Sequence, residues 1–311
     1  MQLIRGLRHL DLFSQGCVLT IGNFDGLHLG HQRVIEKLAR QAQALKLPSV
    51  AIVFEPQPLE YFLGDHAPSR LTRLREKAIQ FAKSPLDALL VLPFNRTLAD
   101  IDAEQFISEI LVNRLRVRHM VIGDDFHFGK ARRGNFAMLQ SKGQELGFSV
   151  ENSQSFELAG LRISSTLIRD ALGEGQLEQA KLMLGRDYSV CGRVAHGDKR
   201  GRQLGFPTAN VEMHRQQIPL HGVFAVTLTG LDDKIHHGVA NLGTRPTING
   251  APRAVLETHL FDFNDNIYGR YVEVHFKAKL RNETRFPNLN ALQTQIQLDV
   301  AAAKTFFAQT L

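Results

Sequence analysis

The order of the apolar segments is the feature that most constrains this fold. Over residues 17–152, short apolar runs alternate with segments whose apolar residues recur at helical spacing. The strand-like runs are residues 18–21, 50–54, 88–92, 119–122 and 148–150. The helical patterns are residues 28–44, 71–81, 103–115 and 136–146. This alternation predicts βαβ units and hence an α/β fold with a parallel sheet, whose ligands bind at the carboxyl ends of the strands.

The pattern changes near residue 186. Five strand-like segments follow, separated by Gly, Pro, Asn and Asp: residues 188–195, 222–229, 235–241, 255–263 and 271–279. They predict a small antiparallel β-barrel. A terminal helix over residues 289–307 should pack against it through an apolar stripe, which consists of Leu292, Ile296, Val300 and Phe307. We therefore expect two domains, residues 1–186 and 187–311.

Composition narrows the class of protein. The chain has 311 residues and two distant cysteines, Cys17 and Cys191, which argues against a disulfide framework or a zinc site. No apolar run is as long as a membrane span and no secretory signal is visible, so we expect a cytoplasmic protein without a membrane partner. The net charge of +6 suits anionic small substrates such as ATP. It is also compatible with nucleic acid, but no basic arm supports that partner.

The loop at residues 22–31 (GNFDGLHLGH) follows a strand and opens a helix. Its N–H groups and the positive end of the helix would face an incoming anion. His28 and His31 lie on one helix face, where they would hydrogen-bond a triphosphate, and Gly30 would leave space for a phosphate. The alternative is an ordinary helix start with two solvated histidines.

A second anion-binding element is predicted at residues 162–169 (RISSTLIR). Ser164, Ser165 and Thr166 stand at the start of a helix, and Arg169 follows one turn later. These hydroxyls would serve as N-caps alone, or together with the arginine as a phosphate site. The presence of two such elements in one α/β domain favours phosphate binding.

In the second domain, a glycine-rich basic loop precedes residues 206–210 (FPTAN). The hydroxyl of Thr208 and the amide oxygen of Asn210 are hard ligands suited to Mg²⁺ that bridges nucleotide phosphates. A turn-rich strand start is the other interpretation. Glu257 lies within a predicted strand, where it is expected to face the barrel interior and to accept a proton from a substrate hydroxyl. An ion pair is the alternative role for this carboxylate.

The motifs of the first domain resemble the adenylyltransferase branch of the H-x-G-H nucleotidyltransferases, which have a Rossmann-like fold. Together with residues 54–58 (FEPQP) and 123–129 (GDDFHFG), they resemble the bacterial bifunctional riboflavin kinase/FAD synthetases. The resemblance implies that the FMN phosphate attacks the α-phosphorus of ATP and that pyrophosphate leaves. It implies catalytic roles for His28 and His31 and flavin contacts for Asp125 and Phe128. The implied nucleotide-binding residues are Gly22, Phe24, Asp25, Gly30, Ser164, Ser165, Thr166 and Arg169.

One position departs from this family pattern. The family usually has histidine in the F-x-P-H-P segment, whereas this chain has Gln57. Glutamine forms hydrogen bonds but carries no proton at neutral pH. A proton-transfer role at this position is therefore not expected, and an anionic phosphate nucleophile does not require one.

The second domain resembles the riboflavin kinases at residues 205–210, 238–247 and 257–269. The resemblance implies that Thr208 and Asn210 serve Mg²⁺–ATP and that Glu257 activates the ribityl 5′-hydroxyl. The loop at residues 197–205 would close over the nucleotide phosphates, with Gly197, Lys199 and Gly201 among the nucleotide-binding residues. The expected small molecules are riboflavin, FMN, FAD, ATP, ADP and pyrophosphate, with Mg²⁺ as the cofactor.

Two other functions compete with this one. A different adenylyl- or cytidylyltransferase with an accessory β domain would not need the set Thr208, Asn210 and Glu257. A flavin- or nucleic-acid-binding regulator without activity would not need the paired histidines or the hydroxyl cluster. The sequence leaves open the oligomeric state, the channelling of FMN and which of the twenty phenylalanines contact the flavin.

Overall fold

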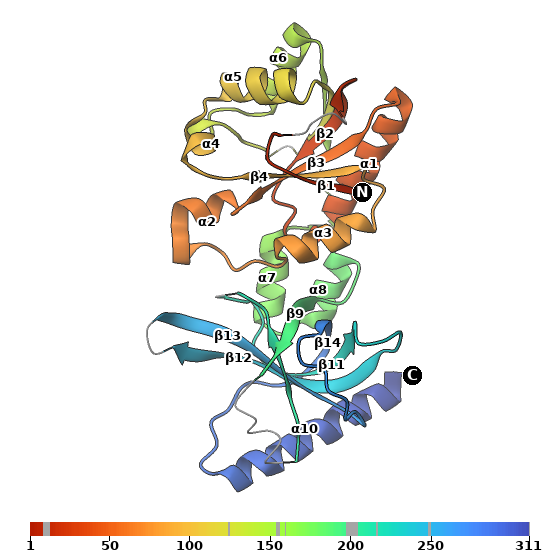
Figure 1. The fold of residues 1–311 in the computed structure, drawn as a ribbon, viewed down its shortest axis with the longest axis vertical. Coiled ribbons are helices and arrows are strands. Elements are labelled where there is room, and N and C mark those ends of the chain that lie inside the picture. The colour runs from red at the N-terminus through yellow and green to blue at the C-terminus, as the bar shows by residue number, and fades with distance from the viewer. Residues whose placement is uncertain are drawn as a thin grey trace. The chain divides into compact units, whose positions relative to one another are not determined.

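The structure is a computed structural model that describes residues 1–8, 13–123, 125–153, 156–158, 160–196, 205–215, 217–247 and 250–310. The chain forms two compact units (Figure 1). The first comprises Met1–Pro68 and Thr72–Ser164, and the second comprises Ser69–Leu71 and Ser165–Leu311. The domain boundary expected near residue 186 stays a prediction.

The first unit is built on a six-stranded sheet in the order β1-β4-β3-β2-β5-β6. All neighbouring strands are parallel, which confirms the predicted sheet. The strands are β1 (Gln2–Arg5), β2 (Cys17–Ile21), β3 (Ser49–Glu55), β4 (Ala88–Pro93), β5 (Val117–Gly123) and β6 (Ser149–Ser153). The edge strand β1 was not predicted, because Ile4 is its only buried residue and a single apolar position gives no pattern.

Helices cover both faces of this sheet, since β2 and most of β3 and β4 are buried throughout. The α-helices are α1 (Leu29–Leu45), α2 (Pro58–Leu63), α3 (Leu74–Ala82), α4 (Arg96–Asp100), α5 (Ala103–Gln105) and α6 (Phe136–Leu146). A π-helical segment, η4 (Phe106–Arg114), continues α5. Short 3-10 turns are η2 (Asp25–Leu27), η3 (Gly64–His66) and η5 (Lys130–Arg132), and β7 (Glu157–Leu158) pairs with β8 (Leu161–Arg162).

Helix α3 begins three residues later than the sequence pattern predicts. The carboxylate of Glu76 accepts a hydrogen bond from the backbone N–H of Arg73 at 2.7 Å, which marks the helix start. Leu71 and Thr72 precede the helix and belong to a loop. Both side chains are buried, which is why the sequence pattern included residue 71 in the helix.

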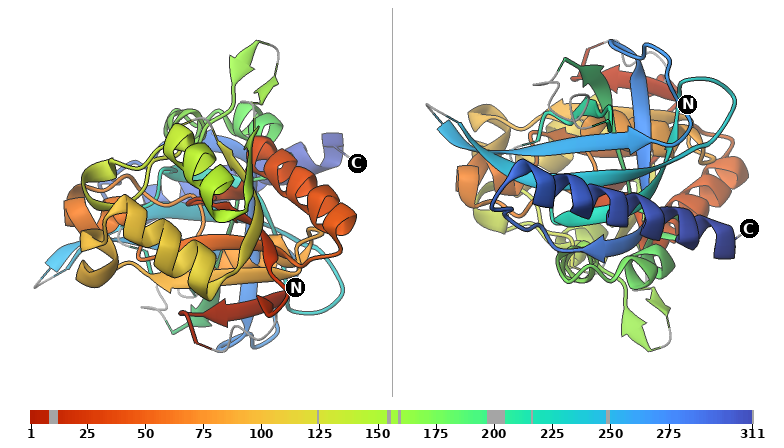
Figure 2. Two further views of the ribbon diagram at one scale, coloured as in Figure 1. Left: turned by 90° about the horizontal axis from the view of Figure 1, so that it is seen from above. Right: turned by 90° about the horizontal axis from the view of Figure 1, so that it is seen from below.

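The second unit contains a closed antiparallel barrel in the order β10-β13-β12-β11-β14-β9, which confirms the predicted barrel. Its strands are β9 (Ser189–Ala195), β10 (Ala209–Glu212), β11 (Gly222–Thr229), β12 (His236–Thr247), β13 (Gly250–Leu260) and β14 (Tyr271–Arg281). Its helices are α7 (Ser165–Gly173), α8 (Leu177–Leu184) and α10 (Leu289–Thr310). Helix α10 crosses the strands on the outside of the barrel (Figure 2).

The alternation of side chains along β13 corrects one expectation. The buried face carries Leu256 and Thr258, whereas Glu257 and His259 are half-buried on the other face. Glu257 therefore does not face the barrel interior. Period-two spacing places it with His259, but only the closed barrel shows which of the two faces is inside.

The terminal helix is held by packing and by one buried ion pair. Val300, Ala303 and Phe307 pack against the outer face of β11 and β12. The buried carboxylate of Asp299 accepts hydrogen bonds from the Arg281 guanidinium, with Nε–Oδ1 at 2.8 Å and Nη2–Oδ2 at 2.7 Å. This bidentate geometry ties α10 to the end of β14.

Replacing Asp299 with Asn should lower the free energy of unfolding of the second unit by about 2–3 kcal/mol, because Arg281 would keep its charge without its carboxylate. Hydrogen exchange of the β11 and β14 amides measures this loss. Lys304→Gln, at an exposed position of the same helix, is the control and should cost less than about 1 kcal/mol. Equal losses in the two variants would contradict the importance of the ion pair.

Candidate active sites

The loop between β2 and α1 has an unusual backbone. Phe24 and Leu27 have positive φ angles of 48° and 41°, and Gly26 between them has a φ of 80°. Left-handed geometry is uncommon for residues with a side chain, so contacts elsewhere must hold this turn. The turn ends at His28, which is extended and forms the N-cap of α1. It therefore brings both predicted histidines to the carboxyl end of the central strand β2.

The structure brings His28 and His31 together. Their rings stack with centroids 3.6 Å apart and planes 19° from parallel. The Nδ1 of His28 accepts a hydrogen bond from the backbone N–H of His31 at 3.4 Å. In the neutral ring, the proton of His28 is therefore on Nε2, which leaves that nitrogen as a donor.

His31 occupies a different electrostatic environment. Its Nδ1 is buried and has no hydrogen-bond partner among the described residues. Burial lowers the pKa of His31 well below its usual value, and the nearby His28 and Lys77 lower it further. The ring of Phe24 packs on it at 5.0 Å between centroids. These surroundings favour the neutral form of the His31 imidazole.

Three other predicted residues of this loop contact other parts of the protein. A Cβ at Gly30 would lie 3.2 Å from the His28 ring, so the glycine makes room for that ring. The buried carboxylate of Asp25 accepts hydrogen bonds from the backbone N–H of Thr72 at 2.9 Å and from its hydroxyl at 3.2 Å. Gly22 lies against the ring of Phe24. Their roles at the nucleotide stay predictions.

The serine-rich segment begins α7, as expected. Ser164 belongs to the first unit, while Ser165, Thr166 and Arg169 belong to the second. The Nε of Arg169 donates a hydrogen bond to the backbone carbonyl of Ser69 at 2.6 Å within the second unit. The phosphate-binding role of this segment stays a prediction.

The two predicted flavin residues differ in exposure. Asp125 is exposed and pairs with Arg162 at 3.1 Å. Phe128 is buried in the core, where its ring packs on Phe106 and Phe126 at 5.4 and 5.5 Å between centroids. The half-buried Phe126 lies on the side of this stack nearer to solvent.

A partly exposed aromatic group at the ends of β3 and β4 was missed by sequence reasoning. Tyr61 and Phe62, on α2, are 41% and 63% exposed and contact the ring of Phe94. Phe94 also contacts Phe54 at the end of β3. We call these four residues the aromatic shelf. Their positions at or after the ends of two predicted strands indicated a location near the ligand-binding edge of the sheet. The sequence does not show which phenylalanines stay exposed.

Gln57, the departure from the family pattern, lies beside this shelf at the N-cap of α2. Its side chain is buried, and its Nε2 has no hydrogen-bond partner among the described residues. The backbone N–H of Gln57 donates to Glu60 at 2.8 Å. The side-chain amide is therefore buried at the start of α2, and neither of its two N–H groups has a partner among the described residues.

In the barrel, strand pairing brings two predicted site residues together. Asn210 and Glu257 are directly opposite in the pairing of β10 with β13, and Glu257 is opposite Asn241 in the pairing with β12. Such cross-strand neighbours have Cβ atoms about 5 Å apart. The Nδ1 of His259 lies 2.9 Å from the carbonyl oxygen of Pro207, to which it donates. The Asn210 amide and the Glu257 carboxylate thus share the outer face of the barrel.

A cavity of about 260 Å³ lies in the same barrel, and neither Asn210 nor Glu257 is among the residues that line it. Thr208 lines it, together with Thr258, Phe263 and Tyr268. The buried hydroxyl of Thr258 has no hydrogen-bond partner among the described residues. Sequence reasoning missed Thr258, because an inward threonine in a strand has no distinguishing pattern.

The described residues also bear on metal binding. Among the residues that the structure describes, no group of three or more His, Cys, Asp or Glu is arranged to hold a metal ion. Thr208 and Asn210 offer neutral oxygen atoms, which suit Mg²⁺ only together with nucleotide phosphates. Gly197, Lys199 and Gly201 lie outside the described residues.

No helix in the described part of the chain is long and apolar enough to cross a membrane.

Comparison with known families divides the chain in the predicted order. A family model described as FAD synthetase matches residues 11–167, and one described as riboflavin kinase matches residues 184–307. A bifunctional riboflavin kinase/FMN adenylyltransferase of Haemophilus influenzae is 52% identical over 99% of each chain. The protein of the same description from Escherichia coli is 48% identical over 100% of this chain and 99% of its own.

The chain belongs to the bifunctional riboflavin kinase/FMN adenylyltransferase family. A crystal structure described as a macrolide-efflux protein from Streptococcus pneumoniae has the same two-part fold. It aligns with a TM-score of 0.81 and 26% identity over 96% of this chain and 97% of that chain.

The lowered pKa of His31 has a measurable consequence in this member of the family. At pH 6 an ordinary imidazole with a pKa of about 6.5 is about three quarters protonated, whereas His31 should remain neutral. NMR of ¹⁵N-histidine-labelled protein, with His31→Gln for assignment, tests this. Because the folded pKa lies below the unfolded one, protonation favours unfolding, and His31 destabilises the fold only below about pH 6.5. A His31 signal that titrates at pH 6.5 would contradict the burial of its charge.

Proposed function

We propose that this chain performs both reactions of its family, phosphorylating riboflavin to FMN in its barrel and adenylylating FMN to FAD in its first unit. The proposal rests on one observation: each family match covers the unit that contains the corresponding candidate site. The FAD synthetase match covers the sheet with the stacked histidines, and the riboflavin kinase match covers the barrel with the Asn210–Glu257 pair. Both reactions use ATP.

For phosphoryl transfer, Glu257 is the base. Its carboxylate accepts the proton of the ribityl 5′-hydroxyl as that oxygen attacks the γ-phosphorus of ATP and ADP leaves. Thr208 and Asn210, the second of which is directly opposite Glu257, would hold Mg²⁺ through their oxygen atoms, and the metal would neutralise phosphate charge. The hydrogen bond from His259 to Pro207 orients the segment that carries Thr208.

For adenylyl transfer, an oxygen of the FMN phosphate attacks the α-phosphorus of ATP and the bond to pyrophosphate breaks. The Nε2–H of His28 donates a hydrogen bond to the phosphate chain as negative charge moves onto the leaving group. The nucleophile is already anionic, so no side chain has to remove a proton. Gln57 in place of histidine is compatible with this chemistry.

The aromatic shelf is the proposed support for the isoalloxazine ring in the first unit. Exposed aromatic faces are costly in water and stack on a flat heterocycle. The shelf follows β3 and β4, at the edge of the sheet where α/β folds bind ligands. Asp125 and the Phe126–Phe128 stack follow β5 at the same edge. This proposal needs no nucleic-acid or membrane partner, and a cytoplasmic location stays a prediction.

The first test is chromatography of the flavins after incubation with riboflavin, ATP and Mg²⁺. Glu257→Gln should lower the rate of FMN formation by at least about 100-fold, because the general base is lost. The same variant should convert supplied FMN to FAD at a nearly normal rate. Glu273→Gln is the matched control, since Glu273 is half-buried in the barrel and bonds to Ser189. Equal loss of both reactions in a folded Glu257→Gln protein would contradict separate sites.

The complementary variants lie in the first domain. His28→Ala and Ser164→Ala should each lower FAD formation by about 10- to 1,000-fold, because a donor to the transition state is removed. Riboflavin phosphorylation by the same samples is the internal control and should not change. A variant that still makes FAD at the full rate would remove that residue from the proposed site.

A further inference from the structure

The turn that carries the two histidines is strained and needs support. Left-handed geometry at Phe24 and Leu27 costs about 1 kcal/mol or more at each residue. Within the turn, the backbone N–H of Leu27 donates to the carbonyl of Phe24 at 3.3 Å. Further support comes from Thr72, just before α3, and from Lys77 within that helix.

Thr72 is the first support. Its hydroxyl accepts a hydrogen bond from the backbone N–H of Gly26 at 2.9 Å, and its own backbone N–H donates to Asp25 at 2.9 Å. Thr72 is buried, so water does not replace these bonds when they break. One threonine thus binds two consecutive residues of the turn.

Lys77 is the second support. Its side chain is 1% exposed, and its ammonium group donates to the backbone carbonyl of Asn23. Burial of an ammonium group is costly unless it is bonded, so the lysine constrains the position of that carbonyl. Its charge also lies near His31, whose pKa it lowers. The Asn23 carbonyl directly precedes the left-handed turn.

We propose that Thr72 and Lys77 are positioning residues for adenylyl transfer, which hold the residue 23–27 turn so that His28 and His31 meet the triphosphate. The proposal rests on the function proposed above. Neither residue needs to touch a substrate, because each acts on the backbone that carries the histidines.

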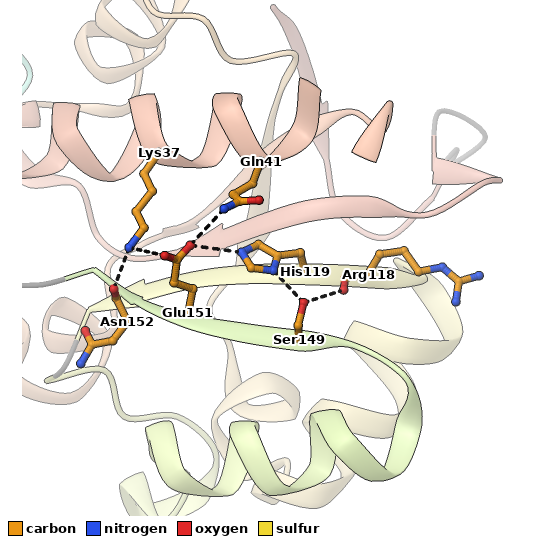
Figure 3. Close-up of polar contacts among 7 residues, drawn as sticks. All are labelled: Lys37, Gln41, Arg118, His119, Ser149, Glu151 and Asn152. Carbon is orange, nitrogen blue, oxygen red and sulfur yellow. Dashed lines mark hydrogen bonds and ion pairs between the residues drawn. The ribbon is translucent and has the colours of Figure 1, made fainter. Parts of the chain in front are cut away.

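A second lysine contact in the same unit, made by the half-buried Lys37, shows what a purely structural role looks like. Lys37 on α1 pairs with Glu151 at 2.8 Å and donates to the carbonyl of Asn152 at 2.9 Å (Figure 3). Glu151 also faces His119, whose ring is fixed by Ser149. These bonds tie α1 to β6 and do not involve the histidine turn. Lys37 is therefore the matched control for Lys77.

The Thr72 pair of variants gives the cleaner test. Thr72→Val keeps the shape but loses the hydroxyl, and it should lower kcat for FMN adenylylation by about 10- to 100-fold, because catalytic groups move out of place. KM for ATP should change less than kcat. Thr72→Ser keeps the hydroxyl and should stay within about threefold of the parent protein. Phosphorylation of riboflavin should be unchanged in both.

The lysine variants add a test of charge. Lys77→Met should lower kcat similarly and raise the pKa of His31 in the NMR titration, whereas Lys37→Met should do neither. Rates are divided by the folded fraction, measured by circular dichroism at the assay temperature. If Lys77→Met does not fold, the Thr72 pair decides.

The proposal is overturned if Thr72→Val keeps kcat within about threefold of the parent, or if Lys37→Met lowers it as much as Lys77→Met. These outcomes differ from failure of the proposed function, in which the parent protein itself makes no FAD.

Discussion

The hydrogen bonds between Thr72 and the Asp25–Gly26 turn are the interactions on which the geometry of the first candidate site depends. The parallel sheet fixes only where β2 ends, at the carboxyl edge. The backbone after β2 must then turn sharply so that α1 can start at His28. That turn uses left-handed residues that are unfavourable alone. Buried hydrogen bonds from the α3 segment offset this cost. A distant part of the sequence thereby sets the geometry of the H-x-G-H motif.

The second site depends on the alternation of side chains in a closed barrel. Strand register places Asn210 opposite Glu257 and Glu257 opposite Asn241. The same register sends Leu256 and Thr258 to the interior and the carboxylate to the outer face, where an ionised group keeps part of its hydration. The apolar interior then stabilises the barrel without burying the charged group of the site.

The two sites use charge differently. Around His31, burial and a neighbouring ammonium group favour a neutral imidazole, which hydrogen-bonds but holds no extra proton. The kinase reaction needs a base for a hydroxyl group, and the half-buried carboxylate of Glu257 suits that task. The adenylyl reaction starts from an anionic phosphate, so a preorganised donor suffices. The two reactions therefore place different electrostatic demands on their sites.

The sequence by itself determined the two-part architecture, most helices and strands, and the residue types of both candidate sites, because hydrophobic periodicity and short motifs are local properties. Tertiary structure decided which face of β13 is inside, which phenylalanines form the aromatic shelf, and that Lys77 lies buried at the Asn23 carbonyl. The edge strand β1 and the late start of α3 also depended on it. These features arise from contacts between residues far apart in the chain, and no local pattern of residues records such contacts.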